Sequence, residues 1–357
     1  MINRERLERV VKNMEKEHIP CLLVTSPASV AYLTGQWIAP GERMLALYLN
    51  QNGDVKLFAN RLFAQAPESG MELIEFDDTD DPIAALSEAV QGGKLGVDKV
   101  WPSQFTIRLM NARRDVQPVL GSRPVDDARM CKDAEEIAIL REASHMNDEA
   151  TRRTIAGIHA GITEIELQDL YTKNAKAVGG AGNSFAPITC FGPNCAEPHH
   201  DNDGTRIKSG DSVIIDVGLL HNRYISDMTR TVFFGHATDE QKRVYEVCRA
   251  ANEAGRAAVR PGVPMCEFDR AARRVIEDAG LGKYFIHRTG HGVGLEVHEP
   301  PDNSATNQVI AKPGMCFSVE PGIYLPGRFG VRVEDLVCVT EDGCETLNEL
   351  TKDFTIV

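Results

Sequence analysis

Four acidic residues in the second half of the chain stand in apolar, strand-like segments. They are Asp216 in VIIDVG, Asp227 in YISDMTRTVFF, Glu320 in FSVEPG and Glu334 in GVRVEDLV. A carboxylate inside such a segment is costly unless it is paired, hydrogen-bonded or bound to a metal ion. A single buried acid is most often a structural residue with its own partners. Four of them in one region instead favour a functional site.

A histidine-rich segment, HRTGHGVGLEVHE, lies between the second and the third of these acids. It places His287, His291 and His298 within twelve residues. Glycines around His291 permit tight turns and the close approach of a ligand. A further pair, His199 and His200, lies upstream in AEPHHDND. A lone histidine is more often structural than catalytic, but three in a glycine-rich frame favour a site.

Together these side chains form an oxygen-rich set with imidazole. Such a set suits a pair of divalent cations such as manganese, cobalt or iron, whereas a zinc site usually carries more imidazole or thiolate. Two metals about 3.5–4 Å apart would share carboxylates and lower the pKa of a bridging water to make a hydroxide nucleophile. Free imidazoles nearby could polarise a carbonyl or pass a proton to a leaving nitrogen. The residue types therefore indicate hydrolysis of an amide-like bond.

The composition excludes several classes of partner. The chain of 357 residues has 52 acidic and 39 basic side chains and a formal charge of −13, which argues against nucleic acid and anionic lipid. No apolar run approaches the roughly 20 residues of a membrane helix, and the amino-terminal segment lacks a signal-peptide core. Nine cysteines without a CxxC pair predict reduced thiols in a cytoplasmic protein. We interpret Cys190 and Cys195 as packing residues.

The first part of the chain alternates strand-like and helix-like patterns. It predicts a compact α/β domain over residues 1–125. The strands are expected at 21–26, 44–50, 55–60 and 94–98, and the helices at 82–90 and 103–113.

The second part, residues 126–357, predicts two helix pairs and several strands that look antiparallel. One helix is expected over 132–158, a second from the capping box Thr163–Glu166 to Val178, and a third of roughly 20 residues after Thr238–Gln241. Continuous strand-like runs occupy 212–220, 228–234, 315–325 and 330–340. These elements must hold the acids and imidazoles together.

The ordered motifs DVG, SDMTRT, GHGVGLEVHE, SVEPG and GVRVED resemble those of the pita-bread metallopeptidases, which include methionine aminopeptidase, aminopeptidase P and prolidase. The two aspartates are 227 − 216 = 11 residues apart, as in that family. The resemblance covers residues 130–357, and SVAYLTG (29–35) resembles the amino-terminal domain of the creatinase and prolidase branch. It implies an α+β fold in which a pita-bread catalytic domain, with a curved antiparallel sheet and two helix pairs, follows a smaller α/β creatinase-type domain.

The resemblance also implies roles for particular residues. Five metal ligands are implied, with Asp227 and Glu334 bridging two metals: Asp216, Asp227, His291, Glu320 and Glu334. Glu320 would also handle a proton of the water, and the catalytic histidines would be His199 at the leaving nitrogen and His298 at the tetrahedral intermediate. The substrate pocket would include His287, Phe185 and Arg332, although core packing explains Phe185 equally well. The implied cofactors are two divalent metal ions, manganese first, with cobalt, iron or zinc as alternatives.

The implied activity is hydrolysis of the Xaa-Pro bond by a metal-bridging hydroxide. An Xaa-Pro dipeptidase (prolidase) is our first interpretation, and an aminopeptidase P that acts on longer peptides is the alternative. Several prolidases bind the free carboxylate of a dipeptide with an Arg after the HE motif, but residues 300–315 contain none and Asp302 stands near that place. Arg328 is a candidate substitute, and Trp37 is a candidate cap from a neighbouring subunit.

Two rival functions remain at this stage. A creatinase-like C–N hydrolase would lack the metals, and a non-catalytic pita-bread protein would bind a partner or nucleic acid. The retention of all five metal-ligand candidates argues against both. The resemblance further implies a homodimer, with proline-containing di- or oligopeptides as substrates.

Overall fold

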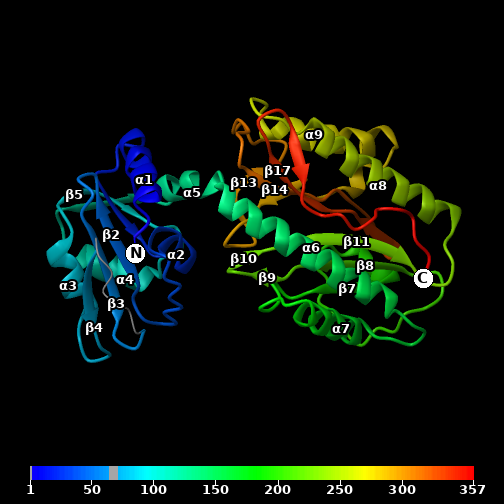
Figure 1. The fold of residues 1–357 in the computed structure, drawn as a ribbon, viewed down its shortest axis with the longest axis horizontal. Helices are drawn as coiled ribbons and strands as arrows, with labels where there is room; N and C mark the ends of the chain where they lie inside the picture. The colour runs from blue at the N-terminus through cyan, green and yellow to red at the C-terminus, as the bar shows by residue number, and fades with distance from the viewer. Residues whose placement is uncertain (1, 64–70) are drawn as a thin grey trace. The chain divides into compact units, whose positions relative to one another are not determined.

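The chain folds into two compact units. Figure 1 shows the computed structural model, which describes residues 2–63 and 71–357. The units are Met1–Arg129 and Met130–Val357. Each unit has buried hydrophobic clusters of its own. No helix within the described ranges is both long and apolar enough to cross a membrane.

A six-stranded sheet with the order β4-β3-β2-β1-β5-β6 organises the first unit. Its strands are β1 (Cys21–Val24), β2 (Ala46–Asn50), β3 (Val55–Asn60), β4 (Glu72–Phe76), β5 (Gly93–Val97) and β6 (Val116–Leu120). Its helices are α1 (Arg4–Lys16), α2 (Pro27–Thr34), α3 (Pro82–Ala89), α4 (Ser103–Ala112) and α5 (Arg123–Met130). Parallel and antiparallel pairs are mixed, since β1 pairs with β5 in parallel and with β2 antiparallel. The expected α/β class of this unit is confirmed.

The sequence did not predict the two edge strands of this sheet. Only the last residue of β4 is buried, and β6 carries Pro118, which cannot donate a hydrogen bond to a neighbouring strand. An edge strand buries little apolar surface. Its sequence pattern is therefore weaker than that of the fully buried β1 and β2.

The second unit is built from small antiparallel sheets. They have the orders β11-β8-β7, β13-β12-β14-β17-β18, β10-β9 and β15-β16. The strands are β7 (Ile188–Phe191), β8 (Ser212–Val217), β9 (Leu220–His221), β10 (Tyr224–Ile225), β11 (Met228–Phe233), β12 (Gly290–Gly292), β13 (Glu299–Asn303), β14 (Cys316–Val319), β15 (Gly322–Leu325), β16 (Phe329–Arg332), β17 (Asp335–Val339) and β18 (Cys344–Thr346). Every strand pair of this unit is antiparallel, as the sequence predicted.

Two helix pairs pack on these sheets. The four helices are α6 (Ala134–Ala156), α7 (Glu164–Ala177), α8 (Asp239–Ala258) and α9 (Met265–Asp278), and short 3-10 turns occur at η1 (Gly192–Ala196) and η2 (Gly282–Tyr284). Figure 1 shows α7 beside β7 and β8, and α8 beside α9. Leu167 and Tyr171 of α7 share a buried cluster with Ile215 of β8. The capping boxes predicted at the starts of α7 and α8 are both present.

Two runs that the sequence predicted as continuous strands are broken in the structure. The run 315–325 divides into β14 and β15 on either side of Glu320, and the run 330–340 divides into β16 and β17 on either side of Glu334. β14 and β17 belong to the five-stranded sheet, whereas β15 and β16 pair with each other. The chain therefore changes sheet at each glutamate, and the apolar pattern continues because both sides of the break are buried.

Candidate active site

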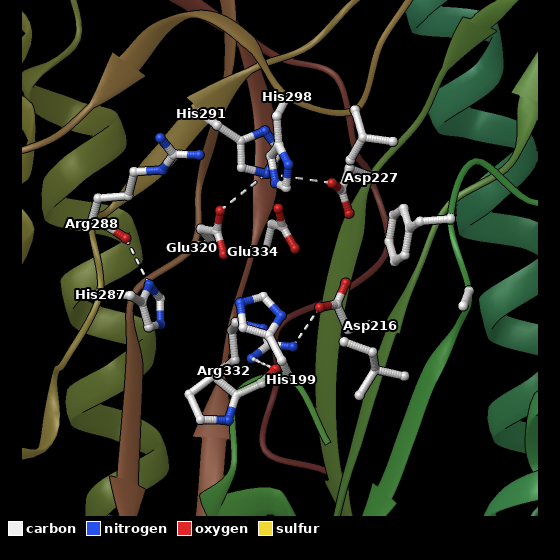
Figure 2. Close-up of a pocket in the computed structure, with 15 residues that line it drawn as sticks. His199, Asp216, Asp227, His287, Arg288, His291, His298, Glu320, Arg332 and Glu334 are labelled. Carbon is white, nitrogen blue, oxygen red and sulfur yellow. Dashed lines mark hydrogen bonds and ion pairs between the residues drawn. The ribbon is translucent and has the colours of Figure 1, made fainter. Parts of the chain in front are cut away.

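The sheets of the second unit bring the four acids together. Asp216 lies in β8 opposite Thr229 of β11, and Asp227 immediately precedes β11. Glu320 and Glu334 lie at the two breaks where the chain leaves the five-stranded sheet. In Figure 2 the four carboxyl groups face a common centre from both sides.

His291 reaches the same centre from β12. Its Nε2 lies 3.3 Å from Oε1 of Glu320 and 3.7 Å from Oδ2 of Asp227. The preceding residue must be glycine, because a Cβ at Gly290 would collide with the carbonyl oxygen of Ser318 on β14. The glycine frame thus lets β12 approach its neighbour closely enough to place the imidazole among the acids.

All ten predicted site residues line one cavity of about 380 Å³. This volume falls in the range of small-molecule sites. The lining consists of Phe185, Ala186, Ile188, Pro198, His199, Asp216, Asp227, His287, Arg288, His291, Val297, His298, Glu320, Arg332 and Glu334. The structure therefore gathers residues separated by up to 149 positions, since 334 − 185 = 149.

The acids fit a divalent metal site. Buried oxygens of three of them have no hydrogen-bond partner among the described residues, namely Oδ1 of Asp216, Oδ1 of Asp227 and Oε1 of Glu334. One ligand atom from each of Asp227, His291 and Glu334 lies within 4.8 Å of the others. Buried polar atoms normally have partners, so orphaned carboxylate oxygens that share a cavity are suited to hold cations.

The electrostatics of the cavity lead to the same conclusion. Burial, followed by the repulsion of neighbouring acids, raises the pKa of Asp227 and of Glu334 well above their usual values. Burial also raises the pKa of Glu320 to about 7. Burial, followed by the nearby His298, lowers the pKa of His291 to about 3, so its imidazole is neutral at pH 7. A bound cation stabilises a neutral imidazole as a ligand, and it offsets the repulsion between ionised carboxylates.

Arg332 balances part of this negative charge. Its guanidinium is buried, pairs with Asp216 and donates to Oγ1 of Thr229 and to the hydroxyl of Tyr324 at 3.1 and 2.8 Å. A further bond, of 3.3 Å, joins it to the carbonyl oxygen of Pro198. All of these partners are protein groups. The structure therefore places Arg332 as a group that orients Asp216 and the Pro198 turn.

The three predicted pocket histidines lie around the acids. The Nε2 of His287 lies 2.9 Å from the hydroxyl of Tyr324, and burial, followed by the charge of Arg332, lowers the His287 pKa to about 4. The rings of His298 and His291 meet edge to face with centroids 4.1 Å apart. Figure 2 shows His199 on the Asp216 side and His298 on the Asp227 side of the acids.

Arg288 is a pocket residue that the sequence patterns did not predict. Arg288 lies between His287 and Thr289, is exposed, and lines the cavity. Its guanidinium has no carboxylate or hydrogen-bond partner in the part of the chain that the structure describes. The only signal available was its position in the segment HRTGH. The alternative Arg328 instead pairs with Glu240 at the surface and does not line the cavity.

A second acidic cluster, Glu164, His200 and Asp203, also has the spacing of a metal site. Both oxygens of Glu164 are, however, already occupied by protein donors. The contrast with the orphaned oxygens in the main cavity identifies this cluster as a hydrogen-bonded structural element.

The fold and this cavity together define a two-unit protein whose second unit carries a site suited to divalent metal ions. Residues 138–341 match the model of Metallopeptidase family M24, and residues 6–131 match the Creatinase/Prolidase N-terminal domain. The chain belongs to metallopeptidase family M24.

Curated and solved relatives agree with this membership. An uncharacterized peptidase from Staphylococcus haemolyticus is 33% identical over 97% of this chain and 99% of its own length. The prolidase from Thermococcus sibiricus has a TM-score of 0.94 and 33% identity, with 100% of both chains covered. An X-Pro aminopeptidase from Thermotoga maritima has a TM-score of 0.83 and 30% identity, and covers 97% of this chain and 100% of its own.

The metal-free protein is expected to lose stability as the pH rises. The pKa of Glu320 increases from its usual 4.5 to about 7 in the folded state. Between these pH values the folded protein binds more protons than the unfolded chain, so the free energy of unfolding falls by up to about 1.4 kcal/mol per pH unit and proton. The contribution of Glu320 to the free energy of unfolding is complete below its usual pKa of 4.5 and is lost above its folded-state pKa of about 7. Asp227 and Glu334 shift in the same direction.

Urea unfolding of chelator-treated protein across this pH window measures the effect. Added manganese should restore stability at the upper end, because a cation binds the ionised carboxylates of the folded state. A metal-free protein whose stability rose with pH over this window would contradict the account.

Proposed function

We propose that this protein is a dinuclear-metal-dependent peptidase that hydrolyses the Xaa-Pro bond, with Xaa-Pro dipeptides as its first substrate class. One observation carries the proposal: four acids, two of them buried and two partly buried, converge with a neutral imidazole in one cavity, and three of the acids have orphaned oxygens. An Xaa-Pro aminopeptidase acting on longer peptides is the alternative, which the Thermotoga maritima structure keeps open.

Five residues would hold two divalent cations, manganese first: Asp216, Asp227, His291, Glu320 and Glu334. The family resemblance implies that Asp227 and Glu334 would contact both cations, and both residues are almost fully buried. When bound, such cations supply an activated water and a Lewis acid for the amide carbonyl. As the family resemblance implies, Glu320 would also take up and return a proton of the water.

The histidines would act on the peptide itself. His298 would donate a hydrogen bond to the oxyanion that forms at the scissile carbonyl, and His199 would contact the substrate near the leaving nitrogen. Proline's amide nitrogen has no hydrogen, so a site for Xaa-Pro bonds cannot rely on an N–H donor from the substrate. His287 and Phe185 line the cavity and would pack against the proline ring.

The position of Arg288 favours dipeptides over longer peptides as substrates. Its guanidinium is the one cationic side chain lining the cavity that has no protein partner within the described residues, since Arg332 is fully engaged. Guanidinium groups bind carboxylates with two parallel hydrogen bonds. A dipeptide ends in a free carboxylate directly after its proline, whereas a longer peptide has a neutral amide there.

The substrate class is tested by comparing alanyl-proline, alanyl-proline amide and alanyl-alanine as substrates under added manganese. The proposal predicts hydrolysis of alanyl-proline and little hydrolysis of alanyl-alanine. Preference for the amide would favour the aminopeptidase alternative. Equal hydrolysis of alanyl-alanine would refute Xaa-Pro specificity.

Replacing Arg288 with Met is expected to raise the KM for alanyl-proline by about 10- to 100-fold, because a charge-assisted hydrogen bond contributes about 1.5–3 kcal/mol. The KM for alanyl-proline amide should change little, because this substrate has no terminal carboxylate for Arg288 to bind. Arg328→Met is the matched control and should leave the KM for both substrates unchanged. Equal losses on acid and amide would show that Arg288 does not recognise the carboxylate.

A further inference from the structure

The two exposed histidines of the cavity lack hydrogen bonds of their own to the described residues, and each is followed by a residue whose side chain forms a buried contact. His199 and His298 line the cavity, and neither ring forms a hydrogen bond with any residue in the described ranges. In each case the side chain of the next residue forms a buried contact instead, namely His200 after His199 and Glu299, the first residue of β13, after His298. Since no hydrogen bond from the described part of the chain fixes either ring, the position of each ring depends strongly on the backbone that carries it.

Glu164, the first residue of α7, holds the His199 loop. Its side chain is fully buried, and its Oε2 lies 2.9 Å from Nε2 of His200 and 3.1 Å from the amide nitrogen of Asp203. Its Oε1 accepts from the amide of Phe191 and from the side chain of Asn194, both at 2.9 Å. One carboxylate therefore fixes the end of β7, the η1 turn and the loop on both sides of His199.

Lys132, just before α6, holds the His298 loop. Its Nζ lies 2.6 Å from Oε1 of Glu299, and the two side chains are only 1% and 4% exposed. Glu299 also lies against the GHGVG turn, where a Cβ at Gly294 would collide with its Oε1. A buried ion pair with residues 167 positions apart thus fixes the start of β13, directly after His298.

From these contacts we infer that Glu164–His200 and Lys132–Glu299 are two separate positioning pairs, the first for His199 and the second for His298. The inference rests on the proposed function in that it assigns both histidines to the substrate. Each pair acts through its own histidine and touches neither the acids nor the substrate. A ring that forms no hydrogen bond of its own loses alignment when its backbone shifts, and small misplacements of catalytic groups reduce rates strongly.

Double-mutant cycles test the separation of the two pairs. Glu164→Gln and Glu299→Gln keep the side-chain shape and remove the charge. Each should lower kcat on alanyl-proline by about 10- to 100-fold, the effect typical of groups that orient other ligands. In the His199→Ala background Glu164→Gln should have less than about a twofold further effect, because the ring it positions is gone. In the His298→Ala background Glu164→Gln should keep its full effect on kcat. Glu299→Gln should have little further effect in the His298→Ala background and its full effect in the His199→Ala background.

The crossed cycles serve as matched controls. A general loss of stability would lower kcat alike in both backgrounds, and that result would overturn the inference. If a glutamine variant does not fold, His200→Asn and Lys132→Met break the same contacts from the other side. Bound metal, measured by mass spectrometry, should stay at the level of the unsubstituted protein.

Histidine modification by diethyl pyrocarbonate provides a readout without activity. Mass spectrometry of the modified peptides should show a changed rate for His199 only in Glu164→Gln, and for His298 only in Glu299→Gln. Unchanged rates, or changes at both rings in either variant, would contradict the inference. If the protein hydrolysed no Xaa-Pro substrate, the proposed function would fail while this experiment still decided whether the pairs fix the rings.

Discussion

Replacing Asp227 or Glu334 with Ala is expected to reduce hydrolysis of alanyl-proline by about 10³-fold or more. Each residue would contact both cations, and a metal Lewis acid supplies several kcal/mol of transition-state stabilisation, with about 1.4 kcal/mol for each factor of ten. Both carboxylates are buried and carry an orphaned oxygen, so water could not easily replace them. The loss should be accompanied by loss of at least one bound metal per chain.

The fold of these variants should survive, because the metal-free cavity contains mutually repelling acids. Repulsion from Asp216 and Glu320 contributes to the raised pKa of Asp227, so its removal relieves unfavourable interactions. Asp302→Asn is a matched control, since Asp302 bonds with Ser304 and Asn307 and does not line the cavity. The control should keep activity and metal. Normal turnover by Asp227→Ala would refute the metal assignment.

His298→Ala is expected to lower kcat by about 10²- to 10³-fold, the range for removal of one donor to an oxyanion. Its ring lines the cavity beside His291 and is exposed to an incoming substrate. Steady-state kinetics with metal analysis of the same sample separates catalysis from ligation. Metal content should stay at the level of the unsubstituted protein. A variant that lost its metal would mean that His298 is a ligand and that the roles of the two histidines need to be exchanged.

The residues of the site could be predicted from the sequence because each stands in a distinctive local frame. An acid in an apolar strand, as in VIIDVG, and a histidine between glycines, as in GHG, are unusual enough to be recognised individually. Their convergence depends on strand pairing between distant segments, such as β12 with β14. The family resemblance supplied that information, and local patterns could not.

Other features were hidden for physical reasons. The breaks at Glu320 and Glu334 leave the apolar pattern unchanged, because the strands before and after each glutamate are buried in different sheets. Arg288 is a single exposed arginine, and only the cavity distinguishes it from other surface arginines. Glu164 looks like an ordinary first-turn acid of a helix, and its four donors come from residues 191–203.

The central claim is that this cavity holds two catalytic divalent cations that act on Xaa-Pro bonds. It is tested most directly by titrating manganese into the chelator-treated protein while metal content and alanyl-proline hydrolysis are measured on the same samples. The account predicts that the binding saturates at two ions per chain and that hydrolysis rises with occupancy. Fewer than one tightly bound ion per chain, together with no activation by manganese or cobalt, would contradict it.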